Sequence, residues 1–262
     1  MPGNPKEDQR AKTRKVTSST SANSMGAGEP KSTGKLEETQ QQLESDWNSP
    51  SLMILFDGGD IKKAMHHLLA SLQNPFAEHA VATLFIQESV REPVIKLLVD
   101  QLKPLDPKIY NHPNYVRSRA KLQQLRSETI VGNPKTVPAH ASPMLVCDIA
   151  HKFLGDGPTG IITMHTFRTP KDAIQVILQE TLAYGSVSIW HEKIASAYEM
   201  CDLLKNDTFM INCFNVDLAP IRPTFDAGKN DALIEGSYHY EILTKNEKSK
   251  IVVSAVGSIF AK

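Results

Sequence analysis

The chain has 262 residues and a mass of 29.0 kDa, and 40% of its residues are hydrophobic, enough to bury the core of one large domain or two small ones. Its 29 basic and 29 acidic residues cancel, which argues against a net field that would draw nucleic acid or an anionic membrane toward it. Three cysteines are too few and too odd in number for a disulfide framework, and neither an apolar leader nor a membrane-length apolar run is readable. These features predict a cytoplasmic protein without a membrane span.

The first 36 residues form a polar segment. Ser, Thr, Gly, Pro, Asn and Lys dominate residues 1–36, and such a composition buries too little apolar surface to offset the entropy lost on ordering. We therefore expect a disordered tail. Its basic excess suits contacts with RNA or an import receptor, or a solvated extension without function, and the second interpretation is the simpler one.

The next segment has the pattern of alternating strands and helices. Residues 52–56 are a short, continuously apolar run between Ser-Pro and Asp-Gly-Gly, which is typical of a strand buried on both faces. Asp60 has the chemistry of an N-cap, and apolar residues recur at helical spacing through residues 61–72. A strand over 82–86 and a helix over 92–102 follow.

The same alternation continues toward the C-terminus. The pattern predicts a polar helix over 113–126, a loop over 131–142, strands over 144–147, 160–166 and 187–190, and helices over 171–182 and 193–205. Strands separated by helices of this length predict an α/β fold with a mostly parallel sheet flanked by helices.

Residues 43–50, 83–90 and five later segments resemble, in the same order, motifs of the aldehyde dehydrogenase superfamily. Residues 43–50 (LESDWNSP) are similar to the family's "LELGGKSP" segment, and residues 83–90 (TLFIQESV) to the strand after its catalytic cysteine. The other similar segments are residues 143–149, 165–173, 184–190, 210–214 and 240–253. The sequences "FIQESV" and "FRT-x-K-x-A" are most similar to those of family-sixteen-like members, some of which lack the catalytic cysteine.

The resemblance implies a domain organisation. A disordered tail over 1–36 would precede an aldehyde-dehydrogenase catalytic-domain-like region over 37–237, and residues 238–262 would be a C-terminal oligomerisation segment. In the family this last segment pairs with the sheet of a neighbouring subunit at an open edge. The chain would then carry the C-terminal half of an aldehyde dehydrogenase, without the cofactor domain.

Two glutamates fall on the family's catalytic positions. Glu44 aligns with the general base, but without a thioester it has nothing to hydrolyse, and Ser45–Asn48 replace the Leu-Gly-Gly-Lys that shapes the turn, so an exposed acid is an equally good interpretation. Glu78 aligns with the nucleophilic cysteine, and a carboxylate cannot form a thiohemiacetal. We consider Glu78 a surface acid; the alternative is a buried carboxylate of raised pKa that binds a polar ligand.

The segment from Gly155 to Gly160 matches the dinucleotide fingerprint G-x-G-x-x-G but lacks the strand before it and the helix after it that the fingerprint requires. We interpret it as a tight turn. The resemblance places it at the family's "EEIFGPV" loop, which makes Asp156 the nearest carboxylate to the one that contacts the nicotinamide ribose.

The remaining cysteines and histidines predict no further site. Cys147 and His151 are four residues apart, but Cys147 ends a predicted strand, so a helical thiol–imidazole pair is not expected. We expect Cys147, Cys201 and Cys213 to be ordinary buried thiols. The nine histidines are scattered, and no set of Cys or carboxylate ligands completes a tetrahedral metal site.

These observations lead to two functional hypotheses. The first is a catalytically inactive aldehyde-dehydrogenase-like domain that binds no cofactor and acts by association with protein, as a homo-oligomer or with a full-length relative, and not with nucleic acid or membrane. The alternative is an oxidoreductase of the family that oxidises aldehydes with NAD(P) only when joined to a complete partner subunit.

Overall fold

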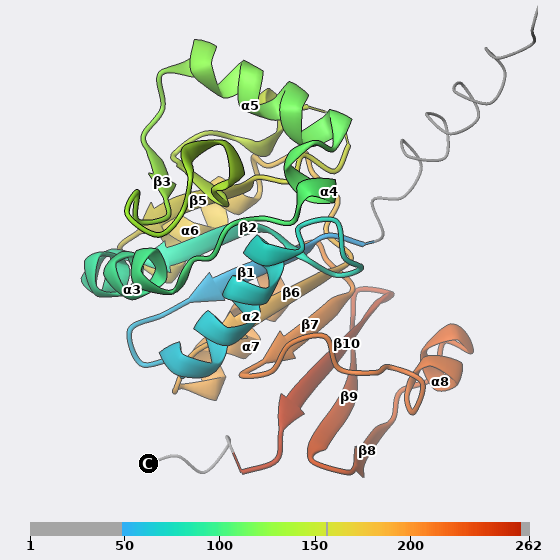
Figure 1. The fold of residues 1–262 in the computed structure, drawn as a ribbon. Coiled ribbons are helices and arrows are strands. Elements are labelled where there is room, and N and C mark those ends of the chain that lie inside the picture. Colours follow the sequence, from blue (N-terminus) through green and yellow to red (C-terminus); the bar gives the residue numbers. More distant parts are fainter. Residues whose placement is uncertain (1–48, 156, 258–262) are drawn as a thin grey trace, which may run out of the picture. The chain divides into compact units, whose positions relative to one another are not determined.

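A ten-stranded mixed sheet runs through the part of the chain that the computed structural model describes, residues 49–155 and 157–257 (Figure 1). Its strands are β1 (Ser51–Leu55), β2 (Val81–Gln87), β3 (Thr129–Val131), β4 (Met144–Cys147), β5 (Ile162–Phe167), β6 (Ser186–Trp190), β7 (Thr208–Ile211), β8 (Ala232–Glu235), β9 (Tyr238–Lys245) and β10 (Lys248–Ala255). They lie in the order β3-β4-β5-β2-β1-β6-β7-β10-β9-β8. The strands from β4 to β10 in this order are parallel, whereas β3 at one edge and β9 and β8 at the other are antiparallel. The expected α/β class with a mostly parallel sheet is confirmed.

Helices cover both faces of the sheet. They are α2 (Ile61–Gln73), α3 (Glu88–Gln101), α4 (Pro107–Tyr110), α5 (Pro113–Leu125), α6 (Pro170–Ile177), α7 (Ile194–Leu203) and α8 (Arg222–Asp226), with short 3-10 turns η1 (Ala139–Ala141) and η2 (His151–Phe153). One buried core joins α2 and α3 to one face of the central strands, and a second joins α6 and α7 to the other. In Figure 1, α2 and α3 accordingly lie in front of the sheet and α6 and α7 behind it.

Local chemistry explains where these elements begin. Every residue of β1 is buried, as expected for a central strand covered on both faces. Asp60 caps α2, because its side chain accepts a hydrogen bond from the backbone N–H of Lys63 at 3.1 Å. Thr169 and Asp172 form a reciprocal capping box at the start of α6, where Pro170 is the first helical residue.

Two helix boundaries and two edge strands differ from the sequence prediction. The helix expected over 92–102 begins at Glu88, which places Pro93 in its second turn, where the backbone loses only one hydrogen bond to the preceding turn. The short edge strands β3 and β8 were not predicted, because pieces of three or four residues carry too little alternation to recognise. The helix expected over 171–182 ends at Ile177.

The C-terminal strands are interior strands. β10 pairs with β7 on one side and with β9 on the other, and β9 pairs in turn with β8. The expectation that the C-terminal strand offers an open edge to a neighbouring subunit is therefore wrong for the described residues, since β8 is the free edge at this end of the sheet.

Candidate functional site

Glu78 lies in the turn between α2 and β2, at the amino-terminal end of the parallel strands. Its side chain is 67% exposed, and Oε1 lies 3.5 Å from Nε2 of His79. The interpretation as a surface acid is confirmed, and the alternative of a buried carboxylate is wrong. Glu44 and Asp156, the other two residues that the resemblance singles out, lie outside the described residues.

Glu78 and His79 stand on the rim of a cleft of about 460 Å³ at the amino ends of β1, β6 and β7. This volume is of the size that small-molecule sites have. The apolar part of its lining is formed by Met210, Val216 and Leu218, and the charged side chains of Asp217 and Arg222 also line it. The remaining lining residues are Ser49, Gly185, Ser186, Thr208 and Asn215.

Some residues of this cleft have an unusual backbone conformation. Three of its non-glycine residues have left-handed backbone conformations: Ser49 (φ 53°), His79 (φ 58°) and Asn215 (φ 49°). Such conformations cost roughly 1 kcal/mol or more for residues other than Gly and Asn, and they persist only where the surroundings enforce them. Ser49 packs closely on Gly185, because a Cβ at position 185 would lie only 2.5 Å from the Cβ of Ser49.

A buried network of hydroxyl and imidazole groups joins β2 and β5 to the loop before β6 and to the segment between β4 and β5. Tyr184 donates a hydrogen bond to Oγ1 of Thr83 at 2.8 Å, and Thr83 bonds Thr163 at 2.9 Å. Thr163 Oγ1 is 3.4 Å from Nδ1 of His151, whose Nε2 lies 3.2 Å from Oγ1 of Thr159. Burial lowers the pKa of His151 to about 4, so the ring is neutral at pH 7.

A second histidine joins this network through a buried carboxylate. Nε2 of His165 lies 3.2 Å from Oε1 of Glu180, and the two side chains are only 10% and 2% exposed. The other oxygen of Glu180 accepts the backbone N–H of His151 at 3.3 Å. The sequence analysis did not identify these residues. A signal was present, because Thr163 and His165 are two residues apart in a predicted strand and therefore place polar groups on the same face of the sheet.

None of the three cysteines lines this cleft or has a depressed pKa. Burial raises the pKa of the Cys147 thiol to about 11 and those of Cys201 and Cys213 to about 12. The prediction of buried thiols is confirmed for all three. A thiolate nucleophile at neutral pH is thus not available from them in this conformation.

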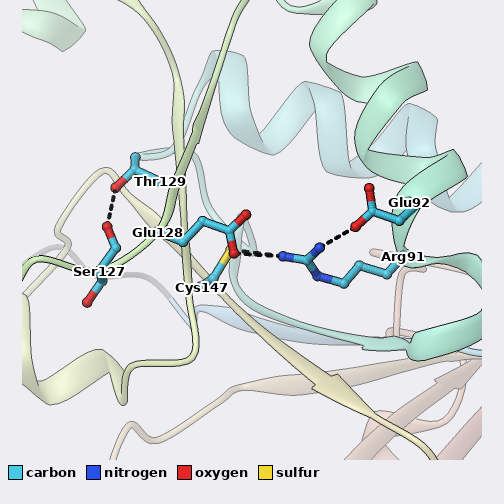
Figure 2. A network of polar contacts seen from close by, with 6 residues as sticks. All are labelled: Arg91, Glu92, Ser127, Glu128, Thr129 and Cys147. Carbon is cyan, nitrogen blue, oxygen red and sulfur yellow. Dashed lines mark hydrogen bonds and ion pairs between the residues drawn. The ribbon is translucent and has the colours of Figure 1, made fainter.

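Cys147 has an arginine beside it, as Figure 2 shows. A guanidinium nitrogen of Arg91 lies 3.7 Å from the sulfur, and the same nitrogen lies 2.9 Å from a carboxylate oxygen of Glu128 (Figure 2). The carboxylate of Glu92 holds the other side of the guanidinium. His151 instead contacts Thr163 and Thr159, so Cys147 and His151 face different partners and the thiol–imidazole pair is not formed.

The glycine segment does not form a dinucleotide loop. The turn η2 precedes it and strand β5 follows it, so no helix N-terminus points at a ligand there. Gly155 and Gly160 have positive φ, and a Cβ on Gly160 would lie 2.8 Å from the ring of Tyr115. Asp156 itself lies outside the described residues, so the tight turn over 155–160 stays a prediction.

Within residues 49–155 and 157–257, no three His, Cys, Asp or Glu side chains are grouped so that they could hold a metal ion. Over the same ranges, no helix is both long and apolar enough to cross a membrane.

Several solved structures with a similar fold are aldehyde dehydrogenases. A putative aldehyde dehydrogenase from Burkholderia cenocepacia matches with a TM-score of 0.51 and 19% identity, over 70% of this chain and 44% of its own. Lactaldehyde dehydrogenase from Escherichia coli matches with a TM-score of 0.50 and 14% identity, over 65% and 40%. Betaine aldehyde dehydrogenase from Staphylococcus aureus, solved in complex with NAD+, matches with a TM-score of 0.51 and 15% identity, over 65% and 38%. The chain thus spans less than half the length of these proteins, and the likeness establishes an aldehyde-dehydrogenase-like fold.

The sequence also matches one protein family. No curated protein matches the sequence. The family described as "Protein of unknown function (DUF1487)" matches residues 46–260, which include the whole sheet and the cleft at Glu78. The chain belongs to this family of unknown function, DUF1487.

Proposed function

We propose that this chain is an aldehyde-dehydrogenase-like domain that does not oxidise aldehydes and acts by association with another protein chain. The observation that carries the proposal is Glu78, the residue that the resemblance aligns with the nucleophilic cysteine. It lies in the turn just before β2, on the rim of the cleft. A kinship with family-sixteen-like members that lack the cysteine is part of the proposal.

The chemistry at Glu78 supports inactivity. Aldehyde oxidation in this superfamily needs a thiolate that adds to the carbonyl carbon, and a carboxylate adds poorly and reversibly. The side chain is mostly exposed and lies 3.5 Å from the partly exposed ring of His79, so its environment resembles that of a solvated acid. No cysteine of the chain is placed to substitute for it, because all three are buried away from the cleft.

The proposed association uses protein surface. The free edges of the sheet are β3 and β8, and Ile234 on β8 is 67% exposed. A second copy of the chain or a complete aldehyde dehydrogenase subunit is the proposed partner, in the cytoplasm, where three free thiols remain reduced. We expect no turnover of NAD or NADP by the chain alone.

The test is dehydrogenase activity of the purified full chain. NAD or NADP would be supplied with acetaldehyde, a longer aliphatic aldehyde or a semialdehyde, and reduced cofactor would be followed by its absorbance. Neither the natural chain nor Glu78→Cys should reduce the cofactor faster than a control without protein. Glu78→Gln, whose side chain has the size of glutamate, is the matched control for Glu78→Cys. Turnover by the natural chain would overturn the proposal, and its loss in Cys147→Ala would identify the thiol responsible.

Two further measurements separate association from catalysis. Light scattering of the full chain should give a mass above that of the 29.0 kDa monomer. A monodisperse monomer at tens of micromolar would refute self-association. Aldehyde oxidation that arises only after mixing with a complete aldehyde dehydrogenase subunit, beyond the activity of that subunit alone, would favour the oxidoreductase hypothesis instead.

A further inference from the structure

We propose that the opposite end of the sheet, the crevice where β1 and β6 end, binds a neutral, hydroxyl-rich small molecule through a vicinal diol of the kind that a pentose or a nucleoside carries. This site is separate from the cleft at Glu78, which lies at the amino ends of the strands. The proposal does not depend on whether the chain oxidises aldehydes.

The connections of β1 and β6 diverge at this crevice. β1 and β6 are parallel neighbours, but the connection after β1 runs through α2 to β2 on one side, and the connection after β6 runs through α7 to β7 on the other. α2 packs on one face of the sheet and α7 on the opposite face. Adjacent strands whose connections diverge in this way leave a crevice outside their carboxyl ends, which is where open α/β sheets bind ligands.

A cavity of about 340 Å³ lies at this point. Its walls come from the segments that follow β1, β6, β7 and the end of β10: Gly58, Asp60 and Lys63; His191 and Glu192; Asn212; and residues 255–257. The volume is that of a site for a small molecule of monosaccharide or nucleoside size.

Two glycines let the walls approach each other. A Cβ on Gly59 would lie 2.6 Å from the carbonyl oxygen of Trp190, so the loop after β1 packs directly on the end of β6. A Cβ on Gly58 would lie 2.7 Å from Cγ of Glu192. Because position 58 has no side chain, the side chain of Glu192 can lie against the loop at the crevice.

The wall formed by the loop after β6 is held firmly. Asn212, with a left-handed backbone (φ 53°), accepts the N–H of His191 at 2.9 Å and donates to its carbonyl oxygen at 2.8 Å. The imidazole packs against the ring of Phe56, with centroids 4.3 Å apart. Its Nδ1 accepts the N–H of Lys193 at 3.0 Å, and burial lowers its pKa, so in the neutral ring Nε2 carries the proton. A rigid wall with a fixed ring tautomer is what selective hydrogen bonding requires.

The charges disfavour an anion. In phosphate-binding crevices the free N–H groups of the helix N-terminus face the ligand. Here the carboxylate of Asp60 caps the N-terminus of α2, and its second oxygen lies 3.5 Å from the ammonium group of Lys63. The positive groups of the crevice are therefore already matched, and Glu192 adds a negative charge. Carboxylate oxygens accept hydrogen bonds from hydroxyl groups, and one carboxylate can accept two from a vicinal diol.

The experiment measures binding of four probes to the full chain by calorimetry or ligand-observed NMR. The probes are D-ribose, adenosine, 2′,3′-dideoxyadenosine and adenosine 5′-monophosphate. We expect saturable binding of ribose, of adenosine or of both. The dideoxy compound should bind about tenfold more weakly than adenosine, because the hydrogen bonds to a charged acceptor are lost. The monophosphate should also bind more weakly than adenosine.

The matched variants are Glu192→Gln and, as a control, Glu199→Gln, which changes an exposed glutamate on α7 away from the crevice. Glu192→Gln should weaken binding about tenfold with an unchanged melting temperature, and Glu199→Gln should not weaken it. Binding of ribose alone identifies a pentose as the ligand, and binding of adenosine alone identifies a nucleoside. The proposal is refuted if neither binds, if the dideoxy compound or the monophosphate binds as tightly as adenosine, or if Glu192→Gln has no effect.

Discussion

The chain contains two glutamate–histidine pairs of similar geometry in opposite environments. Glu78 and His79 are 3.5 Å apart on the cleft rim, with side chains 67% and 35% exposed. Glu180 and His165 are 3.2 Å apart in the interior, with side chains 2% and 10% exposed. In water an ion pair contributes little to stability, whereas a buried carboxylate that loses its partner is left uncompensated. The comparison indicates that the buried Glu180–His165 pair is important for folding, and that the exposed Glu78–His79 pair is free to change.

This division bears on the proposed function. If Glu78 occupies the nucleophile position of aldehyde dehydrogenases, as proposed, its small contribution to stability means that it can be replaced at little cost to the fold once catalysis is lost. The buried hydroxyl groups that link β2 to β5 and to the loop before β6 cannot be removed so easily. An inactive member of the fold would therefore retain its interior while the cleft rim diverges.

The largest expected effect is that of breaking the buried pair. Glu180→Ala should reduce the free energy of unfolding by about 3 kcal/mol, because the N–H of His151 and Nε2 of His165 lose their shared acceptor in the interior. Chemical denaturation at pH 7 measures the change. Glu78→Ala is the matched variant, and as a surface substitution it should stay within about 0.5 kcal/mol of the natural chain. Equal effects of the two variants would show that the comparison is wrong.

The second prediction concerns pH. The pKa of His151 is lowered by burial from its ordinary value of 6.5 to about 4, against the opposing effect of Glu180, so between these values the unfolded chain binds a proton that the folded chain does not. Stability is therefore present above pH 6.5 and is lost as the pH falls toward 4, by roughly 3 kcal/mol from this group. Unfolding free energies at pH 7 and pH 4.5 measure the loss.

A pair of histidine variants isolates this contribution. His151→Asn should flatten the pH dependence between 6.5 and 4, even if it lowers stability at every pH. His140→Asn, which changes an exposed histidine, should leave the slope as it is in the natural chain. An unchanged slope in His151→Asn would mean that other groups cause the acid sensitivity.

The sequence predicted the layered α/β architecture because its central strands are continuous apolar runs and its helices begin at recognisable caps, as at Asp60. It also located Glu78 correctly in an exposed turn. It could not show that Ser49, His79 and Asn215 share one cleft, because residues so far apart in the chain are brought together only by the strand order. Nor could it pair His165 with Glu180, since the loop after α6 that folds back over β5 has no sequence signature.

The third prediction tests the strained side of the cleft. Gly185→Ala should lower stability by about 1–3 kcal/mol, because the new Cβ would lie 2.5 Å from the Cβ of Ser49. Ser49→Gly removes that obstacle and also suits the left-handed backbone at position 49, so it should stabilise the natural chain slightly. The double variant should recover most of the loss in a thermal or chemical melt. Additive effects of the two substitutions would show that they do not meet at this contact.

The smallest expected effect is on a thiol rather than on stability. Burial is the main cause that raises the pKa of Cys147 to about 11; the carboxylate of Glu128 raises it further, and the guanidinium of Arg91 opposes both. Glu128→Gln removes one of the raising causes and leaves Arg91 in place. It should therefore lower the pKa of Cys147 and increase its rate of alkylation by iodoacetamide at pH 8, as measured by mass spectrometry, whereas the rates at Cys201 and Cys213 should not change. Glu92→Gln is the control, because Glu92 holds the same arginine but does not shift the thiol. Equal acceleration by both variants would mean that freeing Arg91, and not removing the charge of Glu128, activates the sulfur.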